Sequence, residues 1–245
     1  MKTYFFLSLK IFKKSFSFYF DHLIFFTKLA TGLCLPWSVI FVLLFFSGLK
    51  EEPLLVVLRI FTWVALILIF VLYIAVVKSI ERLEQGEKKS VLSCYREAIK
   101  LLPAFLKVLG WLVLKIFLWV LLLLVPGFIF GCFYSFSLLA FLIHQKKGKE
   151  ALIHSQSLIK PNLGRFIVAC SVISIVMQIV WLLIIFWADR AYGIPLFSKN
   201  LLKLIVNISL INLFTVIINI LPVVFSVFLY RAFCQEKESI NPNLT

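Results

Sequence analysis

Lys115 is the ionisable residue whose position most needs a chemical explanation, because it lies near the middle of an apolar run over 104–125. An ammonium group in hydrocarbon costs several kcal/mol unless it is hydrated or paired, so such a residue marks a functional site by default. No acidic residue occurs at a similar depth in any apolar run, so its partners must be neutral. Two interpretations stay open: a hydrated functional lysine, or a lysine hydrogen-bonded between helices.

Neutral polar side chains recur in three other apolar runs and could supply those partners. In a lipid-embedded helix such side chains turn towards other helices, so we expect them to share one surface with Lys115. This polar seam would consist of Lys115, Tyr134, Ser135, Ser171, Ser174, Gln178, Asn212 and Asn219. It would serve either as interhelical hydrogen bonding or as the wall of a small substrate path.

Catalytic motifs are absent from the sequence: it has no His-Glu-x-x-His, no phosphate-binding Gly-rich loop and no Gly-x-Ser-x-Gly. The odd number of cysteines, with no Cys-x-x-Cys spacing, argues against a disulfide framework. His22, His144 and His154 are all predicted on one side of the membrane, but three scattered histidines favour interfacial placement over a metal site. We therefore predict no catalytic residue, no metal and no cofactor, and a membrane enzyme ranks lowest among the functions considered.

The composition defines the environment of these residues. Of 245 residues, 62% are hydrophobic and 15% charged, whereas a soluble domain is about half apolar and about a quarter charged. Too few polar side chains remain to cover a water-soluble particle, so lipid must surround most of the chain. The net charge of +14 does not indicate a nucleic-acid partner, because the basic residues cluster between apolar runs, where membrane orientation and anionic headgroups explain them.

Six apolar runs have the length of about 20 residues that a spanning helix needs. The sequence predicts an all-α protein with one membrane domain over 1–245, whose six transmembrane helices in three hairpins cover 23–47, 54–77, 104–125, 127–145, 165–188 and 204–230. The segments 1–20, 78–103, 145–165 and 230–245 together carry 17 lysines and arginines, against four in the connections 48–53, 126–127 and 189–203. The positive-inside rule then predicts that both termini lie in the cytoplasm.

Three segments outside these runs have an apolar stripe and a polar face, which is typical of helices in the membrane interface. They cover 4–19, 90–102 and 149–160, so that each precedes a hairpin. In 90–102 the polar face carries Ser93, Arg96, Glu97 and Lys100, and the prolines at 103 and 161 allow the chain to turn into the next span. The residues expected to contact anionic headgroups are Lys10, Lys13, Lys14, Lys146, Lys147, Lys149 and Arg165.

Small residues in the fourth run predict close helix packing. Pro126 and Gly127 are expected to form the turn of the second hairpin. Gly127, Gly131 and Ser135 then repeat at four-residue spacing, which lets a neighbouring helix approach closely. We interpret this stripe as a packing surface rather than a ligand groove.

The region 125–169 also has a recognisable pattern. It contains Val125-Pro126-Gly127-Phe128, Tyr134-Ser135-Phe136-Ser137, Gly148-Lys149-Glu150-Ala151-Leu152 followed by Ser155 and Ser157, and Lys160-Pro161-Asn162-Leu163-Gly164-Arg165. This pattern resembles a bacterial family of polytopic membrane proteins that includes the membrane domain of glycerophosphoryl diester phosphodiesterases and the YciC-like inner-membrane proteins. The sequence departs from the family pattern at Lys149, where Pro is usual, and at Pro161, where Gly is usual. The resemblance implies a membrane domain without catalytic residues, because the family's enzymes carry their chemistry in a separate soluble domain.

Together with the resemblance, these features predict a non-catalytic polytopic protein of the bacterial inner membrane in envelope or lipid homeostasis, with membrane lipids and their anionic headgroups as partners. The alternative is a transporter or permease subunit with a polar path lined by the third to sixth spans. A dry seam favours the first function, and a hydrated pocket that reaches one membrane face favours the second. Both leave open an oligomer or a partner membrane protein.

Overall fold

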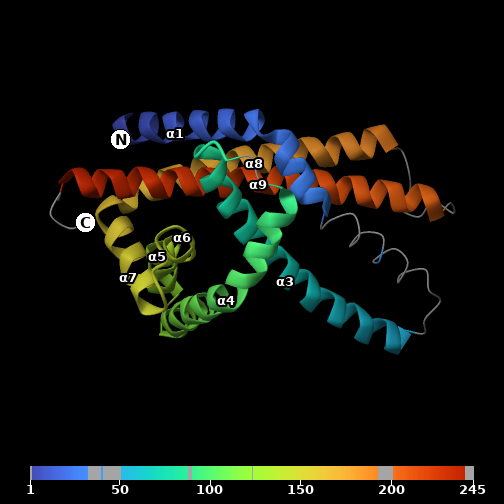
Figure 1. Cartoon of the computed structure of the whole chain (residues 1–245), viewed down its shortest axis with the longest axis horizontal. Coiled ribbons are helices and arrows are strands. Elements are labelled where there is room, and N and C mark those ends of the chain that lie inside the picture. The colour runs from blue at the N-terminus through green and yellow to red at the C-terminus, as the bar shows by residue number, and fades with distance from the viewer. Residues whose placement is uncertain are drawn as a thin grey trace.

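The computed structural model describes residues 2–32, 40, 51–87, 90–122, 124–192 and 201–240, which form helices and no strand (Figure 1). The labelled elements are α1 (Lys2–Asp21), α3 (Glu51–Glu84), α4 (Val91–Leu122), α5 (Leu124–Tyr134), α6 (Ser137–His144), α7 (Lys149–Ile159), the 3₁₀ turn η1 (Lys160–Asn162), α8 (Leu163–Tyr192) and α9 (Leu201–Ile240). A short apolar helix, Leu23–Gly32, follows α1. The predicted all-α class is confirmed.

Five helical stretches of the described residues are long and apolar enough to cross a membrane: Arg59–Glu84, Val91–Leu121, Gly127–His144, Lys149–Leu183 and Leu213–Ser239. They overlap the predicted runs from 54–77 onward, whereas most of the first predicted run, 23–47, lies outside the described residues. Their outer faces carry large apolar side chains, among them Trp63, Leu121 and Leu182, which are 69%, 71% and 66% exposed. Because a water-soluble monomer rarely exposes such continuous apolar surface, these helices are compatible with a multi-pass membrane protein.

The first helix packs on the last one. Residues 4–19, which we predict as an amphipathic helix in the membrane interface, belong to α1, and α1 packs against both α8 and α9 (Figure 1). The Tyr19 hydroxyl donates a hydrogen bond to the backbone oxygen of Ile217 over 2.8 Å, and the rings of Phe12 and Phe225 lie 6.3 Å apart. The face of α1 that packs against the bundle includes Ile11, Ser15 and Tyr19, which are buried, whereas Leu9 and Phe16 remain exposed.

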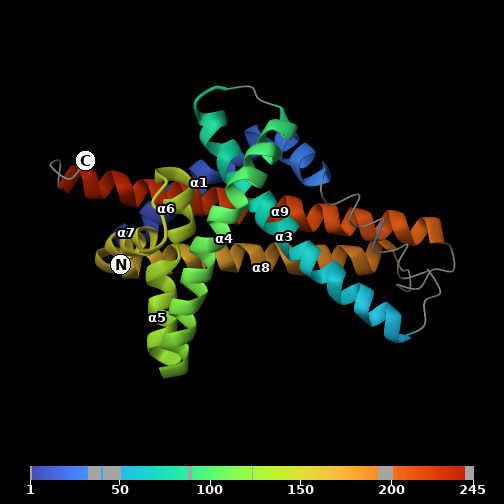
Figure 2. The same cartoon turned by 60° about the horizontal axis from the view of Figure 1, so that its bottom comes forward.

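The second predicted hairpin covers the region of α4 and α5. Helices α4 and α5 pack side by side and project across the direction of α8 and α9 (Figure 2), and Trp119 stacks on Phe130 at 3.9 Å between ring centroids. Helix α5 already begins at Leu124, so the expected turn at Pro126 and Gly127 is wrong. Proline is tolerated there because the first helical turn has no partner for its missing N–H group.

The prolines at 103 and 161 behave differently from each other. Helix α4 continues through Pro103, so residues 90–102 and the following span form one helix and the expected turn between them is wrong. A membrane helix accommodates proline when neighbouring groups compensate the lost hydrogen bond. Pro161 lies instead in η1, which separates α7 from α8, as its sequence position predicts.

Ion pairs join the ends of four helices. Arg82 of α3 pairs with Glu97 of α4, and Glu84 of α3 pairs with Arg231 of α9. Arg165 at the start of α8 pairs with Glu236 near the end of α9. All of these charges are partly buried, so the pairs contribute more to the arrangement of the helices than fully exposed pairs would.

Candidate functional site

A break in the fourth predicted run organises the centre of the molecule. The run 127–145 divides into α5 and α6, with a turn at Ser135 and Phe136 between them. Ser155 of α7 is buried at this break, where its hydroxyl accepts a hydrogen bond from the Phe136 N–H over 3.0 Å and donates one to the Phe133 carbonyl over 2.7 Å. A broken helix in an apolar setting needs such partners, since each unpaired backbone group is costly there.

An apolar pocket of about 290 Å³ lies next to this break. Helices α3, α6, α8 and α9 line it together with the turn, and two residues of the predicted polar seam, Ser135 and Ser174, lie in its wall. The Ser135 hydroxyl donates to the Gly131 carbonyl and that of Ser226 to the Val223 carbonyl, each within its own segment. Most of the lining is aliphatic or aromatic, so this pocket is not a polar path.

The other members of the polar seam do not line this pocket. Lys115, Ser171, Gln178 and Asn219 are exposed, and the Asn219 amide donates to the Thr215 carbonyl in its own helix. Tyr134 is buried, and the side chain of Asn212 lies outside the described residues. The pocket therefore gathers only part of the set that sequence reasoning grouped together.

The predicted packing residues Gly127 and Gly131 of α5 differ in how closely other atoms approach them. A methyl group added at Gly127 would come within 2.6 Å of the Val120 side chain and 2.9 Å of its Cα atom, so α4 and α5 approach closely at this point. At Gly131 an added methyl group would meet no atom within 4 Å. The side chain of Pro126 lies outside the described residues.

A second, polar pocket of about 340 Å³ lies where α3 ends and α4 begins. Its wall is formed by Arg82, Ser93, Arg96, Glu97 and Lys100, the last four from the polar face predicted in 90–102. Three cations and one carboxylate give it a net positive charge. We call it the basic pocket.

Two large apolar side chains accompany the basic pocket on the same helical turns of α4. Leu92 and Ile99 are 68% and 59% exposed. A basic hollow beside exposed aliphatic side chains matches the chemistry of a phospholipid, which has an anionic headgroup above apolar chains.

The predicted headgroup-facing residues lie on several surfaces. Those in α1, Lys10, Lys13 and Lys14, are exposed, as are the three lysines at 146, 147 and 149. Lys14 Nζ lies 5.0 Å from the Phe228 ring, and Lys149 Nζ lies 5.2 Å from the Trp111 ring. Arg165 is partly buried in its ion pair with Glu236. Six of these seven cations are thus exposed.

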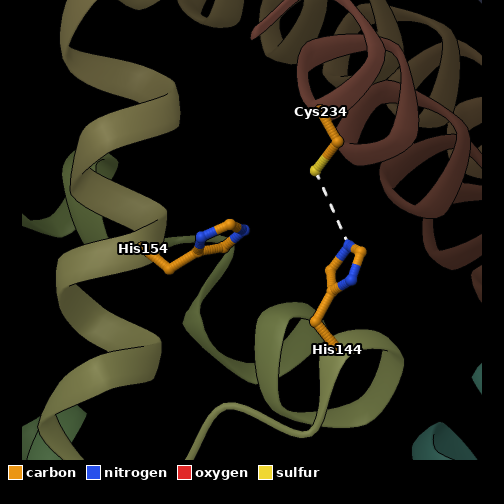
Figure 3. Close-up of side chains that lie close together, drawn as sticks. All are labelled: His144, His154 and Cys234. Atoms are coloured by element: carbon orange, nitrogen blue, oxygen red, sulfur yellow. Dashed lines mark hydrogen bonds between the residues drawn. The ribbon is translucent and has the colours of Figure 1, made fainter. Parts of the chain in front are cut away.

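His144, His154 and Cys234 meet at the junction of α6, α7 and α9 (Figure 3). One potential ligand atom from each residue lies within 4.8 Å of the other two, and Sγ of Cys234 is 3.8 Å from Nε2 of His144. Nε2 of His154 is buried without a hydrogen-bond partner. Sequence reasoning placed the two histidines on one side of the membrane but did not include Cys234, which lies far away in the sequence.

Burial determines the protonation of His154. The helical stretch Lys149–Leu183 is longer than a bilayer requires. His154 belongs to α7, which comes before the predicted span 165–188, so it lies outside that span. Desolvation lowers the pKa of His154 to about 4, and the nearby His144, Lys237 and Lys146 act in the same direction. The imidazole is therefore neutral at pH 7 and has a nitrogen lone pair available for a ligand.

Comparison of the chain with protein-family models, curated proteins and solved structures finds no match. The interpretation of the two pockets and of the histidine–cysteine cluster therefore rests on their own chemistry.

Proposed function

We propose that this chain is a non-catalytic, multi-pass protein of the bacterial inner membrane that binds anionic phospholipids and acts in lipid or envelope homeostasis. The observation that carries the proposal is the basic pocket beside the exposed Leu92 and Ile99. A phosphate group in the pocket would be within reach of Arg96, Lys100 and the Ser93 hydroxyl, while acyl chains would follow the aliphatic side chains into the bilayer.

The proposed topology has six spans in three hairpins with both termini in the cytoplasm. Its support is the distribution of charge: the ion pairs tie together the end of α3, the start of α4, the start of α8 and the end of α9. In the proposed topology all four of these ends belong to the cytoplasmic side. The basic pocket then faces the leaflet surface where anionic lipids attract cations.

The proposed family membership rests on the pattern over 125–169. Its Ser155 and its Phe136 come from separate parts of the pattern and are hydrogen-bonded to each other. Such a contact gives the pattern a structural purpose and no catalytic one. The alternative of a transporter or permease subunit has weaker support, because the pocket beside the break is apolar and most of the polar seam lies outside it.

The test measures lipid binding by native mass spectrometry of the purified full-length protein in non-ionic detergent, with phosphatidylglycerol and phosphatidylcholine as probes. The test variant is R96Q/K100Q, which removes two cations from the basic pocket. Each cation near a headgroup contributes about 1 kcal/mol, so loss of two should weaken phosphatidylglycerol binding by about 30-fold. Binding of phosphatidylcholine should change much less.

The matched control is K146Q/K147Q, which removes two exposed cations on the same predicted side but away from the pocket. We expect this control to retain phosphatidylglycerol binding to within about fivefold. Equal losses in both variants would mean that diffuse surface charge, rather than the pocket, attracts the lipid. Unchanged binding in R96Q/K100Q, with its unfolding temperature preserved, would refute the proposed site.

A further inference from the structure

We propose that His144, His154 and Cys234 form a binding site for one d¹⁰ transition-metal ion, Zn²⁺ or Cu⁺. The three side chains come from α6, α7 and α9, and Figure 3 shows them turned towards one shared space. Imidazole nitrogen and thiolate sulfur are the ligands that these two ions prefer among protein groups. Among the described residues, this is the group of three such side chains whose ligand atoms come together.

The spacing of the ligand atoms is close to that of a bound metal. Metal–nitrogen and metal–sulfur distances of about 2.0–2.3 Å place neighbouring ligand atoms about 3.3–3.8 Å apart. The sulfur of Cys234 and Nε2 of His144 are already 3.8 Å apart, and the largest separation in the group is 4.8 Å. A contraction of about 1 Å is within reach of side-chain rotation, since His144 is exposed at the last position of α6.

Two further features favour a ligand over simple packing. Nε2 of His154 is buried without a hydrogen-bond partner, although a buried polar atom normally has one. The chain after His144 leaves the helix at Gln145, whose φ of 54° is in the left-handed region, and reaches α7 within a few residues. This short connection holds the two histidines near each other while α9 supplies the sulfur.

The charged groups around the cluster affect the Cu⁺ site and the Zn²⁺ site differently. Lys146 and Lys237 lie near His154 and oppose additional positive charge. The thiolate of Cys234 offsets one charge, which makes a Cu⁺ site neutral and leaves a Zn²⁺ site with a net charge of +1. Three ligands complete a trigonal Cu⁺ site, whereas Zn²⁺ would take a water molecule as its fourth ligand.

Metal binding would tie three helices together at one end of the molecule. The ion binds the deprotonated sulfur, so Cys234 releases its proton to solvent as the metal–sulfur bond forms. Because the unfolded chain does not hold these ligands together, binding energy would add to the stability of the fold.

The test uses the full-length protein in detergent, stripped with a chelator and titrated separately with Zn²⁺ and with Cu⁺ under reducing conditions. We expect one equivalent of at least one ion to bind and to raise the unfolding temperature. Co²⁺, used as a spectroscopic substitute for Zn²⁺, should give a thiolate charge-transfer band that C234S lacks. Because loss of even an outer partner of a ligand costs 10–100-fold in affinity, C234S and H154Q should each weaken binding by about 100-fold or more.

The matched controls are C170S and H22Q. Cys170 is a cysteine outside the cluster, and Nδ1 of His22 lies 2.9 Å from the Phe18 carbonyl oxygen in its own segment. Both controls should bind metal as the unchanged protein does. The proposal is overturned if neither ion binds stoichiometrically, or if the control variants lose as much affinity as C234S and H154Q while all of them remain folded. Binding of Zn²⁺ or of Cu⁺ alone supports the site and identifies its ion.

Discussion

Replacing Ser155 by alanine should destabilise the protein more than its small size suggests. The hydroxyl has two hydrogen bonds, one from the Phe136 N–H at 3.0 Å and one to the Phe133 carbonyl at 2.7 Å. Both connect α7 to the break between α5 and α6. Alanine fits the same space but offers neither a donor nor an acceptor.

The magnitude follows from the backbone group left behind. A buried donor without a partner costs about 1–3 kcal/mol, and the Phe136 N–H has no helical partner that could replace the hydroxyl at the turn. We therefore expect S155A to lower the free energy of unfolding by about 2 kcal/mol, near the middle of that range. The Phe133 carbonyl adds little, because an acceptor with two lone pairs is satisfied more easily than a donor.

The chain offers a close control in S157A. Ser157 lies on the same helix and is exposed, with its hydroxyl donating to the His154 carbonyl and accepting from Lys237 over 2.8 Å. Such a surface change should stay within about 0.5 kcal/mol. Unfolding of both variants in detergent, followed by tryptophan fluorescence, measures the difference.

Hydrogen exchange of the peptide that spans 133–138 gives a local readout. It should accelerate in S155A and remain unchanged in S157A, because only the first variant frees the N–H of Phe136. Equal stability of the two variants, together with unchanged exchange at the break, would refute the assignment of Ser155 as the partner of this turn.

Two further substitutions test the helix contacts. G127A should destabilise the protein by about 1–3 kcal/mol through overpacking, since its added methyl group would lie 2.6 Å from the Val120 side chain. The control G131A meets open space, so it should be neutral or slightly stabilising in the same unfolding assay. E84Q leaves the partly buried Arg231 without its carboxylate and should lower the free energy of unfolding by about 1–2 kcal/mol. The exchanged pair E84R/R231E should recover part of that loss. No recovery in a double-mutant cycle would show that the two charges do not interact.

The sequence predicted the helical class and the positions of five long apolar helices because both depend on local properties. Composition and run length alone determine whether a segment can be a membrane helix. The breaks were harder to predict: Pro103 is accommodated within α4, while the break after Tyr134 contains no proline. That break depends on a buried serine from another helix, and such a compensation becomes visible only in three dimensions.

The basic pocket and the polar seam both show how far helical periodicity can predict which side chains come together. Periodicity identified four of the five residues of the basic pocket as one polar face, but Arg82 joins them through the packing of α3 against α4. The polar seam failed to gather for a related reason: hydroxyl and amide groups in apolar helices can satisfy themselves on the carbonyl one turn earlier, as Ser135 and Asn219 do. Such residues need no interhelical partner, so their helical spacing does not predict convergence.

Among the described residues, the two polar clusters therefore lie where helices meet rather than along the long apolar helices. The basic pocket forms where α3 and α4 meet, and the histidine–cysteine cluster forms where the ends of α6 and α9 reach α7. The interhelical ion pairs join α3 to both α4 and α9, so the helices that supply the two sites are also linked to each other. A protein that moved a polar substrate through the bilayer would need its polar groups gathered at mid-depth, whereas a protein that recognises lipid headgroups needs them at the surface. The distribution of the polar groups favours the second kind of protein.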